Sequence, residues 1–170
     1  MHTHDYLELR RKKDEFFRTG HNTPLGPGDH SNFGGLRYFD PDPDMVFTVP
    51  VTPGDGSEIR VPTSDEREKV YKTHGIVNFD ISGDPVELTV YDTPHGLFIP
   101  FRDATSGETT YGSGRYLDLE PNEDGTLTID FNLAYNPSCV YSEGWSCPIP
   151  PTNNWLEVGI EAGEKDYRIE

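Results

Sequence analysis

The chain has 170 residues, enough for one domain with its own core, and 30 acidic against 14 basic residues give it a formal charge of −16. The carboxylates are spread along the chain, which argues against binding to nucleic acid or to an anionic membrane surface, since both need a basic face. Such a surface repels itself in dilute buffer and is screened at molar salt, so it indicates a halophile, in particular an archaeon with a salt-rich cytoplasm.

No apolar run approaches the roughly 20 residues needed to cross a bilayer. The N-terminal stretch MHTHDYLELRRKKDEF has no apolar signal-peptide core. We therefore expect a cytoplasmic protein with one domain over residues 1–170. Within it we expect a helix at 5–18, a connector at 19–36 and a β-rich body at 37–170 that contains a site block at 97–165.

The first predicted element is the helix at 5–18, which has acidic residues in its first turn and is followed by Thr19 and Gly20. One face of it is apolar and is expected to pack on the rest of the fold, while residues 10–13 face solvent. The apolar face consists of Tyr6, Leu9, Phe16 and Phe17.

The connector that follows is too rich in Gly, Pro and Asn to form regular structure. A connector of this length must be held by side chains of its own. Leu25, Phe33 and Leu36 are the candidates.

After Tyr38 the apolar residues alternate, which predicts strands. A turn at 82–85 makes residues 76–92 a hairpin, and a turn at 122–125 predicts a second hairpin. The sequence has no alternation of strands and helices of the kind that indicates a parallel sheet. We therefore expect a mainly β (α+β) fold: an antiparallel barrel or sandwich of eight or nine strands preceded by the helix. The other expected strands lie at 45–51, 97–101, 115–119, 126–132 and 155–161, with a short one near Tyr167.

The site block combines polar and reactive residues with aromatic residues and prolines in a definite order. These residues are Phe101, Asp103, Thr105, Gly107, Thr110, Tyr111, Gly114, Arg115, Tyr116, Asp130, Phe131, Asn132, Tyr135, Asn136, Pro137, Cys139, Cys147, Pro148, Pro150, Pro151, Asn154, Gly163 and Glu164. Their order resembles the bacterial and archaeal family called domain of unknown function 1684, closely over about residues 97–165. The N-terminal helix and the PLG and GGLRYF segments match more loosely. The resemblance implies a site in this block and no particular reaction, because the family has no assigned chemistry.

Arg115 and Asp130 form the first candidate pair. In the strand TLTIDFN, Asp130 and Asn132 share one face, and Arg115 lies on the strand expected to pair with it. A partly buried pair could present an anion site, or it could be an ion pair that braces the barrel.

Asp103 and Asp130 are the two acidic residues within the matched motifs. Asp103 begins a turn with Thr105, where both side chains commonly bond the local backbone. The alternative is a pair of carboxylates for acid–base catalysis.

Cys139 and Cys147 are the only cysteines. Their spacing is not that of the C-x2-C pair of a zinc knuckle. Three interpretations stay open: two buried thiols, a disulfide that closes the loop, or a metal site or reactive thiol, with Cys139 as the candidate nucleophile.

Rings and amides of the block suit a small-molecule pocket. The first hypothesis is a binding protein that holds a small polar or anionic molecule in a polar pocket at one end of the barrel. Its ligand-binding candidates are Tyr111, Arg115, Asn132, Asn136 and Asn154.

The second hypothesis is a hydrolase-type enzyme in which Asp103, Asp130 or Cys139 acts on the ligand. Arg115 would then stabilise the developing negative charge. The sequence names no cofactor, leaves open whether the chain is an enzyme, and allows a homodimer through exposed strand edges.

Overall fold

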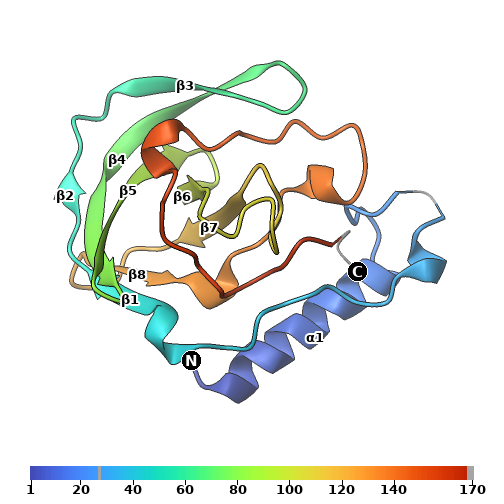
Figure 1. Cartoon of the computed structure of the whole chain (residues 1–170). Coiled ribbons are helices and arrows are strands. Elements are labelled where there is room, and N and C mark those ends of the chain that lie inside the picture. The colour runs from blue at the N-terminus through green and yellow to red at the C-terminus, as the bar shows by residue number, and fades with distance from the viewer. Residues whose placement is uncertain (27, 168–170) are drawn as a thin grey trace.

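The computed structural model describes residues 1–26 and 28–167. In these residues one α-helix precedes eight strands; two short 3₁₀ turns lie between the helix and the first strand, and three follow the last strand (Figure 1). The elements are α1 (Thr3–Thr19), β1 (Val46–Val49), β2 (Thr52–Pro53), β3 (Glu58–Pro62), β4 (Glu68–Ile81), β5 (Asp84–Thr93), β6 (Gly96–Phe101), β7 (Arg115–Leu119) and β8 (Leu127–Asp130), with 3₁₀ turns η1 (His30–Asn32), η2 (Pro43–Met45), η3 (Phe131–Leu133), η4 (Ser138–Val140) and η5 (Thr152–Asn154).

The strands form two antiparallel sheets. The larger follows the order β2-β4-β5-β6-β7, with β3 also paired to β4, and the smaller consists of β1 and β8. The expected mainly β, antiparallel fold with an N-terminal helix is therefore confirmed. The sheets of the described residues do not close into a barrel, because β8 pairs with β1 and not with β7.

The hairpin of β4 and β5 is the longest pairing, and it confirms the hairpin predicted at 76–92. Ser82 and Gly83 form its turn, with φ of 50° and 86°. Two residues with positive φ give a turn whose twist matches that of the flanking strands. The backbone conformation of these two residues is therefore sufficient to reverse the chain.

The main core lies between the two sheets. Its fully buried side chains come from β4, β5, β6, β7 and β8 and from the segment near Ile160. Their burial removes them from water, which is the main favourable contribution to folding. They include Val77, Leu88, Val90, Ile99, Leu117, Leu127 and Ile129.

The second predicted hairpin, 115–119 with 126–132, is wrong in its pairing although its turn is present. Gly125 N donates to Asn122 O and Asn122 N donates to Thr126 O, which closes the turn. Beyond it β8 pairs with β1 in the register Val46 opposite Asp130, and the chain then bends into η3. The alternation of apolar residues fits either partner, so it could not select between them.

The predicted strand at 155–161 is also wrong. Tyr167 itself lies in a turn, and the rest of the short strand predicted near it falls outside the described residues. The chain at 155–161 runs beside residues 102–104 with a single bridge between Arg102 and Trp155. Carbonyls farther along bond the Arg115 side chain in place of a neighbouring strand. This segment crosses in front of the curved larger sheet, where Figure 1 shows it in red.

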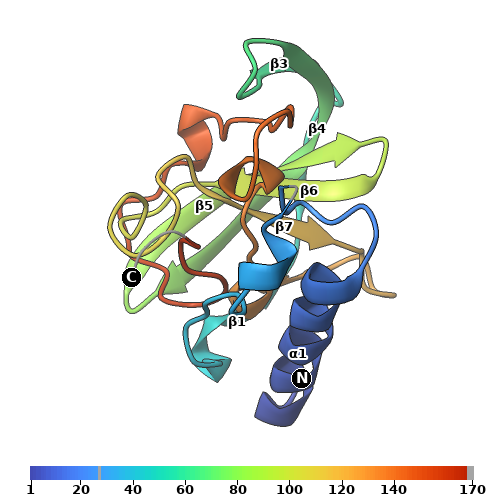
Figure 2. The same cartoon turned by 90° about the vertical axis from the view of Figure 1, so that its right-hand side faces the viewer.

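α1 lies at the lower right in both ribbon views (Figures 1 and 2). Tyr6 and Phe17 are buried, whereas Leu9 and Phe16 are 45% and 48% exposed, so only part of the predicted apolar face packs inward. Residues 10–13 do not all face solvent, because Lys13 bonds the buried Glu164. Among the described residues, no helix has both the length and the apolar character to cross a membrane.

The connector is held by its own apolar side chains, as predicted. Leu25 and Phe33 are buried and Leu36 packs against them. Phe33 lies 5.6 Å from Phe17, centroid to centroid, so the connector folds back on the end of α1.

Tyr6 joins α1 to β8 through one buried hydrogen bond, from its hydroxyl to Asp130 Oδ2 over 2.6 Å. Tyr6→Phe leaves that carboxylate oxygen without this donor, so we expect the free energy of unfolding to fall by about 1–3 kcal/mol. Denaturant titration at high salt measures it. Leu7→Ala is the control, because Leu7 is 52% exposed on the same helix and should change stability little. Equal stability of Tyr6→Phe and wild type would contradict the docking role.

Candidate functional site

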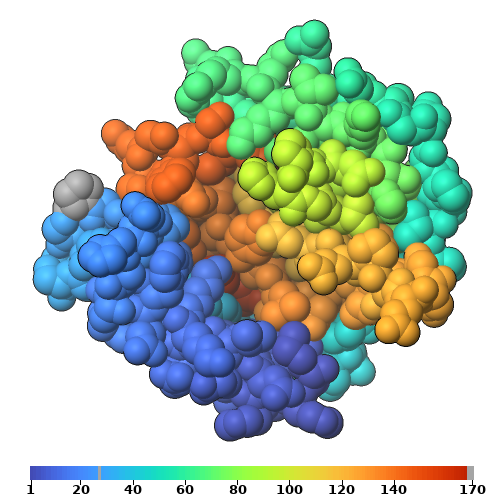
Figure 3. All heavy atoms as spheres, turned by 180° about the vertical axis from the view of Figure 1, so that it is seen from behind, coloured from blue at the N-terminus to red at the C-terminus, as the bar shows by residue number. Residues whose placement is uncertain are grey.

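A groove of about 1000 Å³ opens on one face of the described residues. It lies between the start of β4, the β5–β6 turn, β7 and the segment 135–148. From behind, the surface is hollowed where these green, yellow-green and orange segments meet (Figure 3). Most of the lining comes from elements that are far apart in the sequence.

Aromatic rings line the groove in an edge-to-face series. Tyr71 lies 6.0 Å from Phe98, Phe98 4.9 Å from Tyr116, and Tyr116 5.7 Å from Tyr135, all between ring centroids. Trp145 completes the aromatic lining and is 39% exposed. Contacts of this kind fix the orientation of each ring relative to the next.

Two of the tyrosine hydroxyls are engaged by protein. Tyr116 donates to the carbonyl of Pro148, and Tyr135 donates to Asp118 Oδ1 over 2.8 Å. Burial raises the pKa of both phenols, and the Asp118 carboxylate raises that of Tyr135 further. Both are therefore neutral donors at physiological pH.

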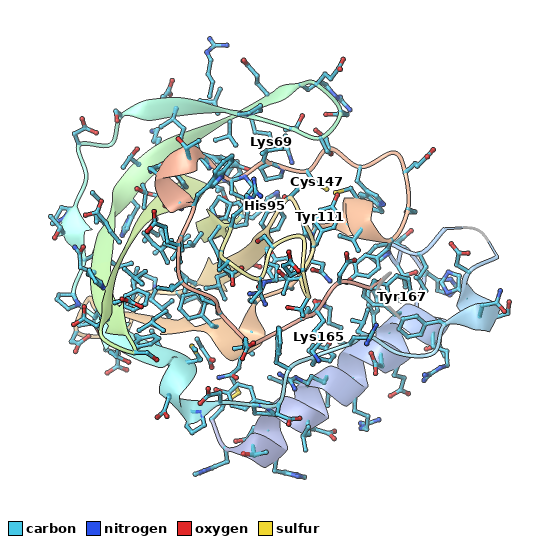
Figure 4. The ribbon with its side chains drawn as sticks, viewed as in Figure 1. Lys69, His95, Tyr111, Cys147, Lys165 and Tyr167 are labelled. Carbon is cyan, nitrogen blue, oxygen red and sulfur yellow. The ribbon has the colours of Figure 1, made fainter. Side chains whose placement is uncertain are left out.

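Polar and charged side chains border the rings: Lys69 at the start of β4, the His95 imidazole in the β5–β6 turn, and Asp118 and Glu120 on and after β7. Figure 4 shows Lys69, His95 and Cys147 gathered in one part of the molecule, with Lys165 and Tyr167 apart from them beside α1. The groove thus has one lysine ammonium, Lys69, and two carboxylates along its border.

The two cysteines are neighbours and both are free thiols; Cys147 is buried and Cys139 is partly exposed. The Tyr111 hydroxyl lies 3.8 Å from Cys139 Sγ. The interaction with Cys147 and burial raise the pKa of Cys139. Cys147 lines the groove, whereas Cys139 does not. No three His, Cys, Asp or Glu side chains of residues 1–26 and 28–167 come together as a metal-binding group.

Arg115 is buried, and all its interactions are with protein. It bonds the carbonyls of Ile160, at 2.9 Å, and of Ala162 and Glu164. Its ion-pair partner is Asp103, at 3.5 Å, and not the predicted Asp130. Burial lowers the pKa of Arg115, while the Asp103 carboxylate opposes that change.

Asp103 is equally enclosed. Its Oδ2 accepts from Ile160 N at 2.6 Å and from the Thr105 hydroxyl at 2.8 Å, so the turn interpretation fits its geometry. Asp103 and Asp130 are held by different partners, and the structure does not present them as a pair.

The three candidate amides bond backbone groups. Asn132 bridges Asp42 and Asp130. Asn154 bonds Thr89 and Pro100. Asn136 donates to the carbonyl of Lys165, and its side-chain oxygen is buried without a partner among the described residues. The structure brings none of the three into the groove.

Sequence reasoning therefore found the block that supplies one wall of the groove and missed the opposite wall. Tyr135 and Trp145 were among the aromatic residues of the block, but Lys69, His95 and Tyr71 lie outside it. One available signal was Lys69, one of only five lysines in the chain.

Comparison with known proteins places the chain in a family. The model of a family described as a protein of unknown function, DUF1684, matches residues 31–165, and the chain belongs to this family. A solution NMR structure of an uncharacterised protein of Haloarcula marismortui is similar, with 40% identity and a TM-score of 0.72. The match covers 95% of this chain and 92% of that one. The search of curated proteins gave no match.

The Arg115–Asp103 pair is open to a stability test. Arg115→Ala leaves a buried carboxylate and three carbonyls without their donor, so we expect the free energy of unfolding to fall by about 3–5 kcal/mol. Arg102→Ala is the control. Arg102 is half-buried, and its side chain stacks on Trp155 with 4.3 Å between Cζ and the ring centroid, so we expect this variant to lower the free energy of unfolding by only about 1 kcal/mol. A fully stable Arg115→Ala variant would exclude a structural role for the pair.

Proposed function

We propose that this protein binds a small molecule with an aromatic or apolar body and a polar or anionic end, in the groove between β4, β7 and the segment 135–148. The single observation that carries the proposal is the groove itself, about 1000 Å³ lined by five aromatic side chains. Ligand pockets are commonly of this size and combine apolar walls with a few polar groups.

The two kinds of lining have separate roles in this proposal. The rings of Tyr71, Phe98 and Tyr116 supply contact area at fixed orientation. Lys69 and His95 border one side and supply the groups that orient an anionic end. Selectivity for ligands that carry both features follows from this division.

Binding is better supported than the hydrolase alternative. Asp103 and Arg115 have their polar atoms occupied by backbone and by each other, away from the groove. Asp130 is held by Tyr6 and Asn132. A catalytic acid or base must reach its substrate, so these side chains favour structural roles.

We also propose that the protein works in a salt-rich cytoplasm. Two observations support this: the charge of −16 and the 40% identity to a protein of the halophile Haloarcula marismortui. Molar salt screens the repulsion among its carboxylates.

A fluorescent probe tests the groove. 1-Anilinonaphthalene-8-sulfonate has fused rings and a sulfonate, and we expect it to bind the folded protein at one site in high salt. Trp145→Ala should weaken this binding about tenfold, which corresponds to 1.4 kcal/mol. Lys69→Ala should weaken it by a similar factor, through loss of the cation.

The chain supplies a matched control for this experiment. Trp155 is 47% exposed and does not line the groove, so Trp155→Ala should leave probe affinity unchanged. Equal losses in the two tryptophan variants, or no saturable binding to the wild type, would refute the proposed site.

A further inference from the structure

A second, smaller pocket lies beside α1. Its volume is about 80 Å³, and it is bordered by α1, by η3 and by the chain around Tyr38 and Glu164. Of the described residues, Tyr135 alone lines both this pocket and the groove. Pockets for organic ligands start at roughly 300 Å³, whereas a single water molecule needs roughly 10–15 Å³. This pocket therefore suits a small ion or a few water molecules.

Two buried hydrogen-bond donors at this pocket have no partner among the described residues: Arg10 Nη2 and the Tyr38 hydroxyl. The Arg10 guanidinium stacks on the Tyr38 ring, with 4.3 Å between Cζ and the ring centroid, so the two groups are neighbours. Native structures rarely leave a buried donor without an acceptor, because its lost hydration is then not replaced. An acceptor in the pocket would satisfy these donors.

Both groups are held in place as donors. Arg10 Nη1 donates to the carbonyl of Phe39 over 2.8 Å, which leaves Nη2 for another acceptor. An arginine side chain has donors only. Burial, together with the nearby Glu164 and Asp14 carboxylates, raises the pKa of Tyr38, so its hydroxyl keeps its proton and can donate.

The carboxylate and amide acceptors that line the pocket already have donors of their own. Both oxygens of the buried Glu164 carboxylate accept from Lys13, at 2.9 and 3.1 Å, and each accepts one further hydrogen bond from the protein. The side-chain oxygen of Asn132 accepts a backbone N–H. Arg10 and Tyr38 therefore require another acceptor.

An anion fits this requirement better than water does. The charged groups of the lining are Arg10, Lys13 and Glu164, two positive and one negative. Asp40 also attracts Arg10, but it is exposed and does not line the pocket, so molar salt screens its effect. A water molecule between the two donors would have to place its own hydrogens on acceptors, whereas a halide ion needs donors only.

We propose that this pocket binds one chloride ion, held by Arg10 Nη2 and the Tyr38 hydroxyl. The ion joins α1, through Arg10, to the chain at Tyr38, which pairs with Glu164. It thereby reinforces the docking of the helix alongside the hydrogen bond from Tyr6 to Asp130. The proposal does not depend on a ligand in the groove.

Chloride-dependent stability of the full-length protein tests the proposal. A ligand that binds only the folded state multiplies the folding constant by 1 + [L]/Kd, so chloride at about ten times its Kd gives about a tenfold increase. Urea titrations compare potassium chloride with potassium gluconate at the same molar concentration of potassium. The folding constant of the wild type should be about tenfold larger in chloride.

Variants of the two donors separate a bound ion from a general effect of the salt. Tyr38→Phe removes one donor and keeps the ring on which Arg10 stacks, so it should lose most of the chloride-dependent increase. Arg10→Gln removes the other donor with its charge and should lose the increase as well.

Arg11→Gln is the matched control. Arg11 is exposed on the same helix and pairs with Glu8 and Glu15, so this variant loses a positive charge of α1 away from the pocket. It should keep the full chloride-dependent increase. An increase as large in Tyr38→Phe as in the wild type would overturn the proposal.

A crystal structure of the wild type grown in potassium bromide covers the case in which a variant does not fold. Bromide replaces chloride and is identified by its anomalous scattering. One bromide in contact with Arg10 Nη2 and the Tyr38 hydroxyl is the expected result. A water molecule at that position, or an acceptor supplied by the protein, refutes the site. Bromide there without chloride-dependent stability of the wild type means an adventitious ion only, which also overturns the proposal.

Discussion

The buried guanidinium of Arg115 is the interaction on which the rest of the structure depends. It donates hydrogen bonds to the carbonyls of Ile160, Ala162 and Glu164, in a segment that is not a strand. It also forms an ion pair with Asp103, whose carboxylate accepts a hydrogen bond from Ile160 N. One side chain thus supplies donors that a neighbouring strand would otherwise give. This fixes Glu164, whose buried carboxylate bonds Lys13 of α1 and the Tyr141 hydroxyl. Helix, sheet and the segment 135–148 therefore meet around the C-terminal segment.

The segment 135–148, which forms one wall of the groove, is fixed at both of its ends. The segment 135–148 is held at one end by the backbone pairing of Tyr135 with Tyr116 and at the other by that of Pro148 with Thr63. Both ends of the segment line the groove, while Val140 and Tyr141 in its middle are buried against Phe17. Because both ends are tied to β-structure, the rings and the Cys147 sulfur are held without the segment itself being a strand. A preorganised wall of this kind lowers the entropic cost of binding.

Local signals were sufficient for some elements and not for others. The hairpin of β4 and β5 could be predicted because its turn residues and its alternation lie within one stretch of sequence. The partner of β8 could not, since β1 lies about eighty positions earlier and fits the pattern no better than β7. The partner of Arg115 was missed for a related reason: once β7 and β8 do not pair, Asp130 faces Tyr6 and Asp103 is the nearby acid. The cysteines were recognised as a feature, but their neighbours Ser64 and Tyr111 could not be, because both are remote from them in sequence.

β4 runs through two separate groups of apolar side chains. Its first half contributes Tyr71 to the aromatic cluster of the groove, and its second half contributes Val77 and Ile81 to the main core. A register shift between Thr73 and Gly75 separates the halves. A Cβ at Gly75 would lie 2.5 Å from Thr52 O, so a residue without a side chain is needed where β2 pairs with β4. Selection can therefore act on the two groups independently. Substitutions among the rings of the first half therefore leave the side chains of the main core in place.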